Sequence, residues 1–218
     1  EVAFASTGLE RLHRAAKDLC GATLNDAVLT SVAGGLRRWV LEHHGHLGVV
    51  RVMVPVSLHH EGDDAANRDS FFTVSLPLNE PDPVTRLRET QAATSVRKAD
   101  DDAQRMDTLL RHLGDISPSL EQLCVRIERS PRSFAVNVSN VPGPRLPVTL
   151  LSAPVEALYA LAEIGERHAL RVTVVSLGDT LSFGICADPG IVEHVQTIAD
   201  GIEAETAELT AAALAPGR

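Results

Sequence analysis

The feature that most constrains the fold of this chain is a strand that runs directly into a loop stiffened by two prolines. Residues 134–138 alternate apolar with small or polar side chains, which predicts a half-buried β-strand. The loop that follows, residues 139–145, reads Ser-Asn-Val-Pro-Gly-Pro-Arg. Each proline fixes its own φ and disfavours the α region for the residue before it, whereas Gly143 can take backbone angles closed to other residues. Either the loop is a plain strand exit, or it is a rigid surface that binds a ligand or a neighbouring domain.

Hydrophobic periodicity predicts helices and strands along the rest of the chain. Helices are expected over residues 8–20, 25–45 and 191–213, strands over 49–58 and 71–78, and a hairpin over 170–187 with Gly178-Asp179 at its turn. Residues 81–130 are expected to form two or three helices, the last opened by Pro118, and residues 146–165 show no clear pattern. The strand over 49–58 is expected to be buried on both faces. One α/β domain over residues 1–218 is the simplest interpretation.

The helix over residues 25–45 is the clearest of these elements. Its first turn is expected to be capped by Asn25 or Thr23, and the helix dipole favours Asp26 there. The Gly34-Gly35 pair is costly inside a helix, so it predicts close packing against another element.

Composition and charge exclude several classes of protein. The 218 residues suffice for a core without disulfides, and with only 3% aromatic residues that core must consist of Val, Leu, Ala and Ile. The formal net charge of −9 argues against nucleic acid as a partner, because phosphate binding needs clustered Lys and Arg. Three dispersed cysteines fit a reducing cytosol, and no apolar run is long enough for a membrane span. Because the chain begins at Glu1, we expect a piece of a longer protein.

One histidine pair suggests acyl transfer. His59-His60-x-x-x-Asp64 matches most of the His-His-x-x-x-Asp-Gly motif, in which the second His is a general base and the Asp holds the local geometry. Here Ala65 replaces the Gly of the motif. His60 is therefore a candidate general base, and the alternative is that two ordinary histidines lie exposed on a polar loop.

Metal and nucleophilic chemistry find less support. His43, His44 and His46 lie at the end of a predicted helix, where cations are favourable without any metal. No second cluster of Cys or His completes a tetrahedral set, so no metal is expected. The sequence contains no Gly-x-Ser-x-Gly elbow and no phosphate-binding glycine loop, and no cofactor is expected.

Three segments of the chain resemble a known family. They read Asn25-Asp26-Ala27-Val28-Leu29 with Leu36-Arg37-Arg38-Trp39 downstream, Met53-Val54-Pro55-Val56-Ser57, and Ser139-Asn140-Val141-Pro142-Gly143-Pro144. In this order and spacing they resemble the C-terminal half of bacterial wax ester synthase/diacylglycerol acyltransferases, over nearly the whole chain. The resemblance implies a fold like chloramphenicol acetyltransferase and the condensation domains, in which two related α/β halves surround a channel. This chain would be one half, a mixed β-sheet packed with helices.

The resemblance also implies where a site would lie. The His-His-x-x-x-Asp-Gly motif belongs to the N-terminal half, which this chain lacks and which is its expected partner. The residues implied at the channel, or at the seam between the halves, are Asn25, Asp26, Ser139, Asn140, Pro142, Gly143 and Pro144. Two departures from the family, His59 for its usual Arg and Ala66 for its usual Gly, put in doubt any role copied to that loop. The His59-His60 segment aligns with the exit of the Pro-Val-Ser strand and not with the catalytic motif.

The family reaction moves an acyl group from acyl-coenzyme A to a diacylglycerol or a long-chain alcohol. Three hypotheses follow: a half-domain with little or no activity alone, a complete acyltransferase that uses His60, or a binding or scaffolding module that kept the fold without the chemistry. The first hypothesis predicts an apolar surface around residues 25–29 and 138–144 that a partner half covers or that self-associates. It also implies a cytoplasmic location, with peripheral contact at the inner membrane or at lipid droplets.

Overall fold

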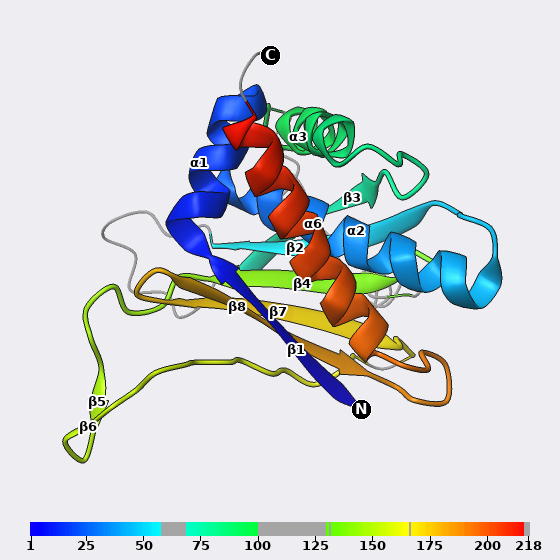
Figure 1. Cartoon of the computed structure of the whole chain (residues 1–218). Helices are drawn as coiled ribbons and strands as arrows, with labels where there is room; N and C mark the ends of the chain where they lie inside the picture. Colours follow the sequence, from blue (N-terminus) through cyan, green and yellow to red (C-terminus); the bar gives the residue numbers. More distant parts are fainter. Residues whose placement is uncertain (58–68, 100–129, 131, 166, 216–218) are drawn as a thin grey trace, which may run out of the picture.

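The computed structural model describes residues 1–57, 69–99, 130, 132–165 and 167–215 as a mixed sheet and four helices (Figure 1). The elements in chain order are β1 (Val2–Gly8), α1 (Leu9–Cys20), α2 (Leu24–His44), β2 (Val50–Ser57), β3 (Asp69–Leu76), α3 (Pro83–Ala99), β4 (Val136–Val141), β5 (Thr149–Leu150), β6 (Ala153–Pro154), β7 (Leu170–Leu177), β8 (Thr180–Ala187) and α6 (Gln196–Leu214). The helices predicted within residues 100–129, including the one opened by Pro118, lie outside the described residues.

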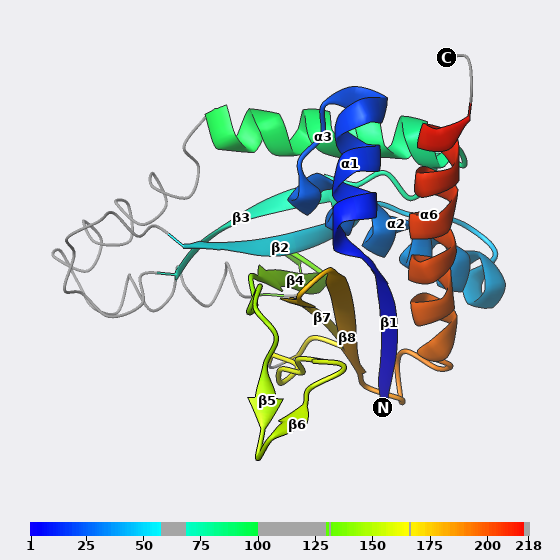
Figure 2. The ribbon, with the colours of Figure 1, turned by 60° about the vertical axis from the view of Figure 1, so that its left-hand side comes forward.

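Six strands form the main sheet in the order β1-β8-β7-β4-β2-β3. The central pairs β2/β4 and β4/β7 are parallel, and the outer pairs are antiparallel. The helices gather on one face of this sheet, and the chain between β4 and β7 runs past the opposite face (Figures 1 and 2). The described residues therefore form two layers, and among them the opposite face of the sheet is covered by extended chain.

The prediction from hydrophobic periodicity is confirmed for the β7–β8 hairpin, the helices α1 and α2, and the strands β2 and β3. The hairpin turns at Gly178, whose φ of 57° favours glycine. The closing helix begins at Gln196, later than predicted, because residues 188–192 form a turn in which the Asp188 carbonyl oxygen accepts the N–H groups of Ile191 and Val192 at 3.0 and 2.8 Å.

The strands of the structure differ from the predicted ones in three respects. The sequence interpretation missed β1, which pairs with β8 along its whole length and buries Ala3 and Ala5. β4 continues to Val141, three residues beyond the predicted end, because it pairs with β7 as far as that residue. β2 is not buried on both faces: Val52 and Val54 are buried, and Met53 between them is only half-buried.

The contact between α2 and α6 depends on three glycines. A Cβ on Gly35 would lie 2.6 Å from the carbonyl oxygen of Ile198, and a Cβ on Gly201 would lie 2.7 Å from the Cα of Gly35. Real Cβ contacts are almost never this short, so the backbones of the two helices touch directly. The close packing predicted from Gly34-Gly35 is confirmed, and its partner is α6.

A buried ion pair fills the remaining space between α2, α3 and α6. Arg86 of α3 pairs with Glu205 of α6, and both side chains are almost fully buried. The side chain of Glu205 occupies the space beside Gly34, because a Cβ on Gly34 would lie only 2.5 Å from Glu205 Oε2. The guanidinium also donates to the carbonyl oxygen of Glu80 at 3.0 and 2.7 Å and to that of Pro81 at 3.1 Å, which ties the β3–α3 connection to α6. Burial raises the pKa of Glu205, and the opposing effect of Arg86 on that pKa is smaller.

We expect Gly35→Ala to destabilise the protein. The new methyl group would meet α6 backbone, and overpacking of this kind costs about 1–3 kcal/mol. Thermal unfolding should show a fall in Tm of ~2–4 °C per kcal/mol for a chain of this size. Gly48→Ala is the matched control, because a Cβ there has no atom within 4 Å, and it should change stability by no more than about 0.5 kcal/mol. An unchanged Tm in Gly35→Ala would contradict the direct backbone contact.

We expect Glu205 to make the protein less stable as the pH rises. Its pKa in the folded state is raised above the ordinary 4.5, so its contribution is fully present below pH 4.5 and is lost as the pH rises through the folded pKa. Urea unfolding at a series of pH values should show this decline in the wild type and not in Glu205→Gln. Glu42→Gln, at an exposed carboxylate, should keep the wild-type pH dependence. A decline that survives in Glu205→Gln would assign the effect to another group.

Candidate functional site

The first turn of α2 is held by a reciprocal capping box between Thr23 and Asp26. Asp26 Oδ2 accepts the backbone N–H of Thr23 at 2.8 Å and its hydroxyl at 2.7 Å, and the Asp26 N–H donates to Thr23 Oγ1 at 3.3 Å. Thr23 is therefore the N-cap, and the alternative that Asn25 caps the helix is wrong. Asn25 is the second residue of the helix and is half-buried.

Asp26 also joins α2 to α3. Its second carboxylate oxygen, Oδ1, accepts the hydroxyl of Thr94 at 2.6 Å, and the Asp26 residue is only 2% exposed. Both carboxylate oxygens thus accept hydrogen bonds within the fold. The structure supports a positioning role for Asp26, which fixes the turn that carries Asn25.

The Pro-Gly-Pro loop is fastened to the β7–β8 hairpin. Gly143 N–H donates to Ser176 Oγ at 2.9 Å, and the carbonyl oxygen of Pro144 accepts the N–H of Gly178 at 3.0 Å. A Cβ on Gly143 would overlap the carbonyl oxygen of Ser176. Gly143 is required here for close approach to β7 and not for a left-handed φ, because its φ is not positive. The rigidity that the two prolines predict is therefore reinforced by contacts with the hairpin.

Ser139 and Asn140 belong to the strand rather than to the loop. They are half-buried residues of β4, paired with Thr173 and Val174 of β7. The parallel strands β2 and β4 end at the same edge of the sheet, on the side where α1 and the start of α2 lie (Figure 1). The topology thus brings the Asn25 turn and the end of β4 to one side of the molecule.

The expected apolar surface is present at one of its two predicted places. Val141 is 51% exposed, and Pro142 and Pro144 are exposed beside it. The prediction for residues 25–29 is wrong, because Ala27, Val28 and Leu29 are fully buried in the main core.

The sequence interpretation missed a set of polar groups on the sheet face opposite to α1, α2, α3 and α6. Asn137 of β4 and Thr173 of β7 lie on this face, opposite to Val138 and Val172, and Ser182 of β8 lies there too. Asn137 Oδ1, Thr173 Oγ1 and Ser182 Oγ are buried and have no hydrogen-bond partner among the described residues. The sequence does contain a signal for these polar groups, because Asn and Ser alternate with Val within β4 and so lie on the face opposite to the Val side chains.

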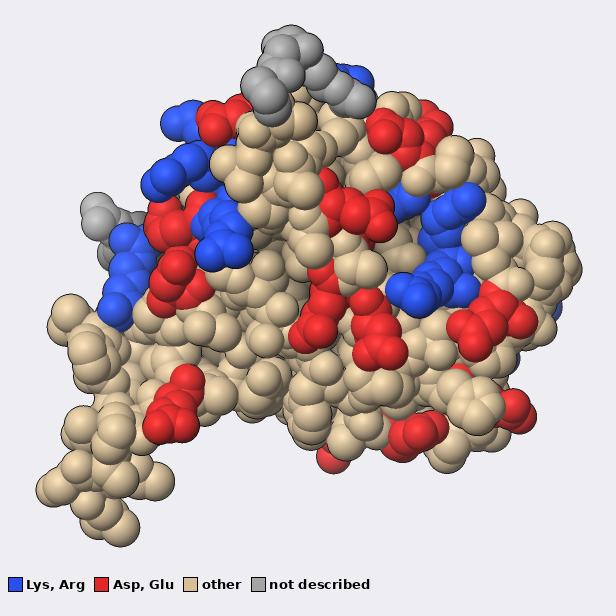
Figure 3. Space-filling model, in the orientation of Figure 1, with Lys and Arg blue, Asp and Glu red and all other residues tan. Residues whose placement is uncertain are grey.

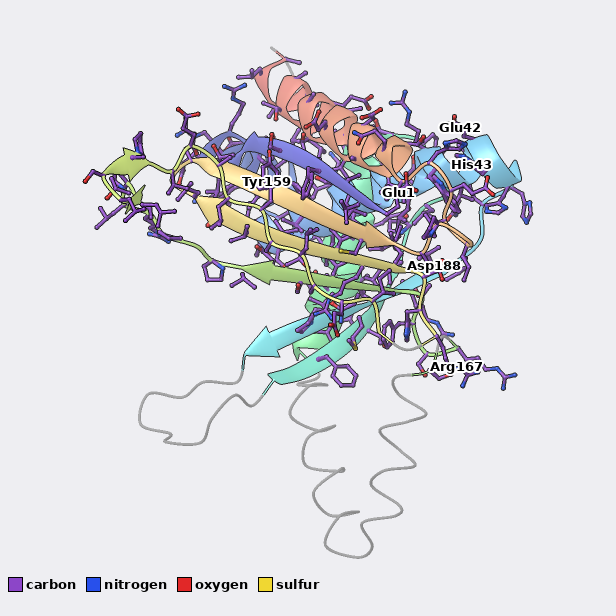
Figure 4. The ribbon with its side chains drawn as sticks, turned by 90° about the horizontal axis from the view of Figure 1, so that it is seen from below. Glu1, Glu42, His43, Tyr159, Arg167 and Asp188 are labelled. Atoms are coloured by element: carbon purple, nitrogen blue, oxygen red, sulfur yellow. The ribbon has the colours of Figure 1, made fainter. Side chains whose placement is uncertain are left out.

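One extended segment crosses this face. Figure 4 shows the chain that includes Tyr159 running across the sheet, and the Tyr159 ring packs on Phe4 of β1 with ring centroids 4.8 Å apart. A Cβ on Gly184 of β8 would overlap the carbonyl oxygen of Ala160, so the segment lies directly against the sheet. Arg171 Nη1 donates to the carbonyl oxygen of Glu163 at 3.1 Å and fixes its far end.

The histidines at the end of α2 make ordinary local contacts. His43 Nδ1 lies 2.8 Å from the carbonyl oxygen of Trp39, and the two rings stack with centroids 5.1 Å apart. His46 Nδ1 lies 3.0 Å from the carbonyl oxygen of His44. Within the part of the chain that the structure describes, no group of three or more His, Cys, Asp or Glu side chains could hold a metal ion.

His60, the candidate general base, lies outside the described residues, as do His59 and Asp64. No helix among the described residues is both long enough and apolar enough to cross a bilayer.

The sequence of the chain identifies its family. The sequence model of the WS/DGAT C-terminal domain matches residues 65–210, and the chain belongs to that family. It is 27% identical over 202 residues to the O-acyltransferase WSD of Acinetobacter baylyi, an alignment that covers 92% of this chain and 44% of that protein.

Solved structures agree with the family. The wax ester synthase/diacylglycerol acyltransferase from Marinobacter aquaeolei matches with a TM-score of 0.75 and 25% identity, over 98% of this chain and 49% of that one. The first condensation domain of the CDA synthetase shares the fold, with a TM-score of 0.54 and 19% identity over 100% of this chain and 46% of that chain. The chain thus spans about half the length of the Acinetobacter and Marinobacter proteins, and the predicted fold class is confirmed.

We expect Thr23→Ala to destabilise the protein by about 0.5–2 kcal/mol, because it removes the N-cap of α2. Asn25→Ala should change the free energy of unfolding by no more than about 0.5 kcal/mol, since this residue does not cap the helix. Urea unfolding of the two variants and the wild type measures both values. A larger loss in Asn25→Ala than in Thr23→Ala would reverse the assignment of the cap.

Proposed function

We propose that this chain is the C-terminal half of a bacterial O-acyltransferase that transfers an acyl group from acyl-coenzyme A to a diacylglycerol or a long-chain alcohol. The observation that carries the proposal is the match of nearly the whole chain to one half of the Marinobacter wax ester synthase/diacylglycerol acyltransferase, with its family model matching the same chain. The proposed partner is an N-terminal half that supplies the His-His-x-x-x-Asp-Gly motif.

In the proposed reaction the acceptor hydroxyl attacks the thioester carbonyl carbon of acyl-coenzyme A. The general base of the N-terminal half takes the hydroxyl proton as the new C–O bond forms. The C–S bond then breaks, and the proton passes to the departing thiolate of coenzyme A. Products are the ester and free coenzyme A, and no other reactant is consumed.

In the proposed reaction, this chain contributes preorganised groups at the start of α2 and at the Pro-Gly-Pro loop. The capping box and the Thr94 contact fix the turn on which Asn25 lies, so the amide of Asn25 can orient a reactant without moving. The start of α2 also carries the positive end of the helix dipole, which favours a developing negative charge on the carbonyl oxygen. The anchored Pro-Gly-Pro loop forms the seam with the other half in this proposal.

We expect this chain alone to show little or no acyl transfer, and a mixture with its N-terminal half to show it. Loss of a general base costs ~10²–10⁴-fold in rate, so the difference is easily measured as release of coenzyme A thiol. In the mixture, Asn25→Ala should lower kcat by about 10²-fold if its amide orients a reactant.

The matched control is Asn79→Ala, at an exposed asparagine, which should keep full activity. Robust turnover by the 218-residue chain alone, lost on His60→Ala, would replace the proposal with a self-contained acyltransferase. No turnover in a mixture that forms a complex would favour a binding or scaffolding module.

A further inference from the structure

The buried face of α3 carries a row of polar side chains. Arg86, Thr90 and Thr94 are spaced four residues apart and so lie on one face of the helix. Figure 3 shows charged side chains spread over the outside of the helices, whereas the members of this row are only 2%, 0% and 0% exposed. Burial of a hydroxyl is unfavourable unless it is hydrogen-bonded, and valine would fill the same space without that cost. Packing alone therefore does not account for the two threonines.

The three members of the row differ in their partners. Arg86 pairs with a carboxylate of α6 and donates to carbonyl oxygens of the β3–α3 connection. Thr90 Oγ1 is buried and has no hydrogen-bond partner among the described residues. Thr94 is hydrogen-bonded to Asp26 of α2. Thr94 is thus the member of the row that contacts the start of α2.

The hydroxyl of Thr94 has one hydrogen and two acceptors within reach. Its oxygen lies 2.6 Å from Asp26 Oδ1 and 3.1 Å from the carbonyl oxygen of Gln91. The shorter distance is in the range of roughly 2.5–2.7 Å that is typical of a hydroxyl donating to a carboxylate, and such bonds are about twice as strong as those between neutral groups. The hydroxyl hydrogen therefore points to Asp26.

The bond to Asp26 fixes the start of α2 in a way that the capping box does not. The capping box joins Asp26 to Thr23, and both residues belong to the start of α2. It would therefore move with the helix, whereas the Thr94 bond ties the same carboxylate to α3, which is itself anchored to α6 through Arg86. Asn25 lies between Thr23 and Asp26 in the chain, so its backbone is held from both sides.

We propose that Thr94 is a positioning residue of the acyl transfer, and that it acts through Asp26 to hold the Asn25 turn in one place relative to α3. Thr94 is fully buried, so its effect on a reactant passes through these two residues. The inference rests on the proposed function, from which it takes the role of the Asn25 amide. A displacement of about 1 Å in a group that orients a reactant can cost ~10²-fold in rate, so one buried hydroxyl is enough to affect turnover.

The first test is turnover of the full-length polypeptide, numbered as here, with palmitoyl-coenzyme A and hexadecanol. Thr94→Val keeps the size of the side chain and removes the hydroxyl, and it should lower kcat by at least ~10-fold with KM changed by less than about 2-fold. Thr94→Ser keeps the hydroxyl and should stay within about 2-fold of the wild-type kcat. The matched control is Thr90→Val, on the same buried face, where the lost hydroxyl has no partner among the described residues. Its kcat should equal the wild-type value.

Three outcomes of this test would overturn the proposal. They are an unchanged kcat in Thr94→Val, an equal loss in Thr90→Val and Thr94→Val, and a loss that Thr94→Ser fails to restore. If Thr94→Val does not fold, Thr94→Ala and Thr94→Ser repeat the comparison, because these two side chains differ only in the hydroxyl.

Hydrogen exchange gives a readout that does not depend on acyl transfer. The Asp26 N–H donates to Thr23 Oγ1 at the start of α2. In the full-length protein, Thr94→Val should speed exchange in the peptide that spans residues 22–29 by at least about 5-fold, because this turn opens more readily without the bond to α3. Thr94→Ser and Thr90→Val should exchange as the wild type does, and unchanged exchange in Thr94→Val would overturn the proposal. Faster exchange in Thr94→Val, combined with no acyl transfer by the wild type, would count against the proposed function and not against the hold of Thr94 on the turn.

Discussion

The direct backbone contact between α2 and α6 is the constraint on which the rest of the structure depends. Gly35 and Gly201 allow the two helices to touch, and Gly34 leaves the space that Glu205 occupies. Arg86 enters the same space from α3 and pairs with Glu205, so three helices share one buried polar centre. The position of α6 in turn affects the edge strand, because Glu203 Oε1 accepts the Ser6 N–H of β1 at 3.0 Å. A larger side chain at any of these glycines would therefore disturb both layers.

This contact also fixes α2 along its length, which matters for the site. Near its end, Trp39 Nε1 donates to the carbonyl oxygen of Glu193 at 2.6 Å. At its start, Asp26 is bonded to Thr23 and to Thr94 of α3. A helix held at both ends and along one face presents its first turn in a single orientation, and such preorganisation is what a site needs for precise placement of a reactant.

Elements that depend on residues close in the sequence were predicted correctly. Elements that form only by pairing with a distant strand were missed. Gly178 makes the β7–β8 turn by itself, and the apolar stripe of α2 is local, so both were predicted correctly. β1 was missed because its short run of small residues becomes a strand only by pairing with β8, more than 170 residues later. Ser139 and Asn140 were expected in a loop for the same reason, since their partners are on β7.

The site itself was predictable only in part. Thr23 and Asn25 are both good caps, and a shift of two residues in the start of the helix decides between them, which the sequence pattern does not resolve. Val28 and Leu29 are buried in the core, whereas the family resemblance suggested their exposure. His60 stays a prediction, because it lies outside the described residues.

The two faces of the sheet differ in polarity. The face toward the helices is apolar and closed, with Val52, Val138 and Val172 among its buried residues. On the other face Thr173 and Ser182 keep hydroxyls that find no partner among the described residues, although an unpaired buried hydroxyl costs about 1–3 kcal/mol and an apolar side chain of similar size would avoid that cost. Both side chains are almost fully buried, so a partner for these hydroxyls must lie within the covered face, as a buried water would. In the proposed two-half protein, the helical face would supply stability, and the extended segment that covers the polar face would lie on the side left free for the other half.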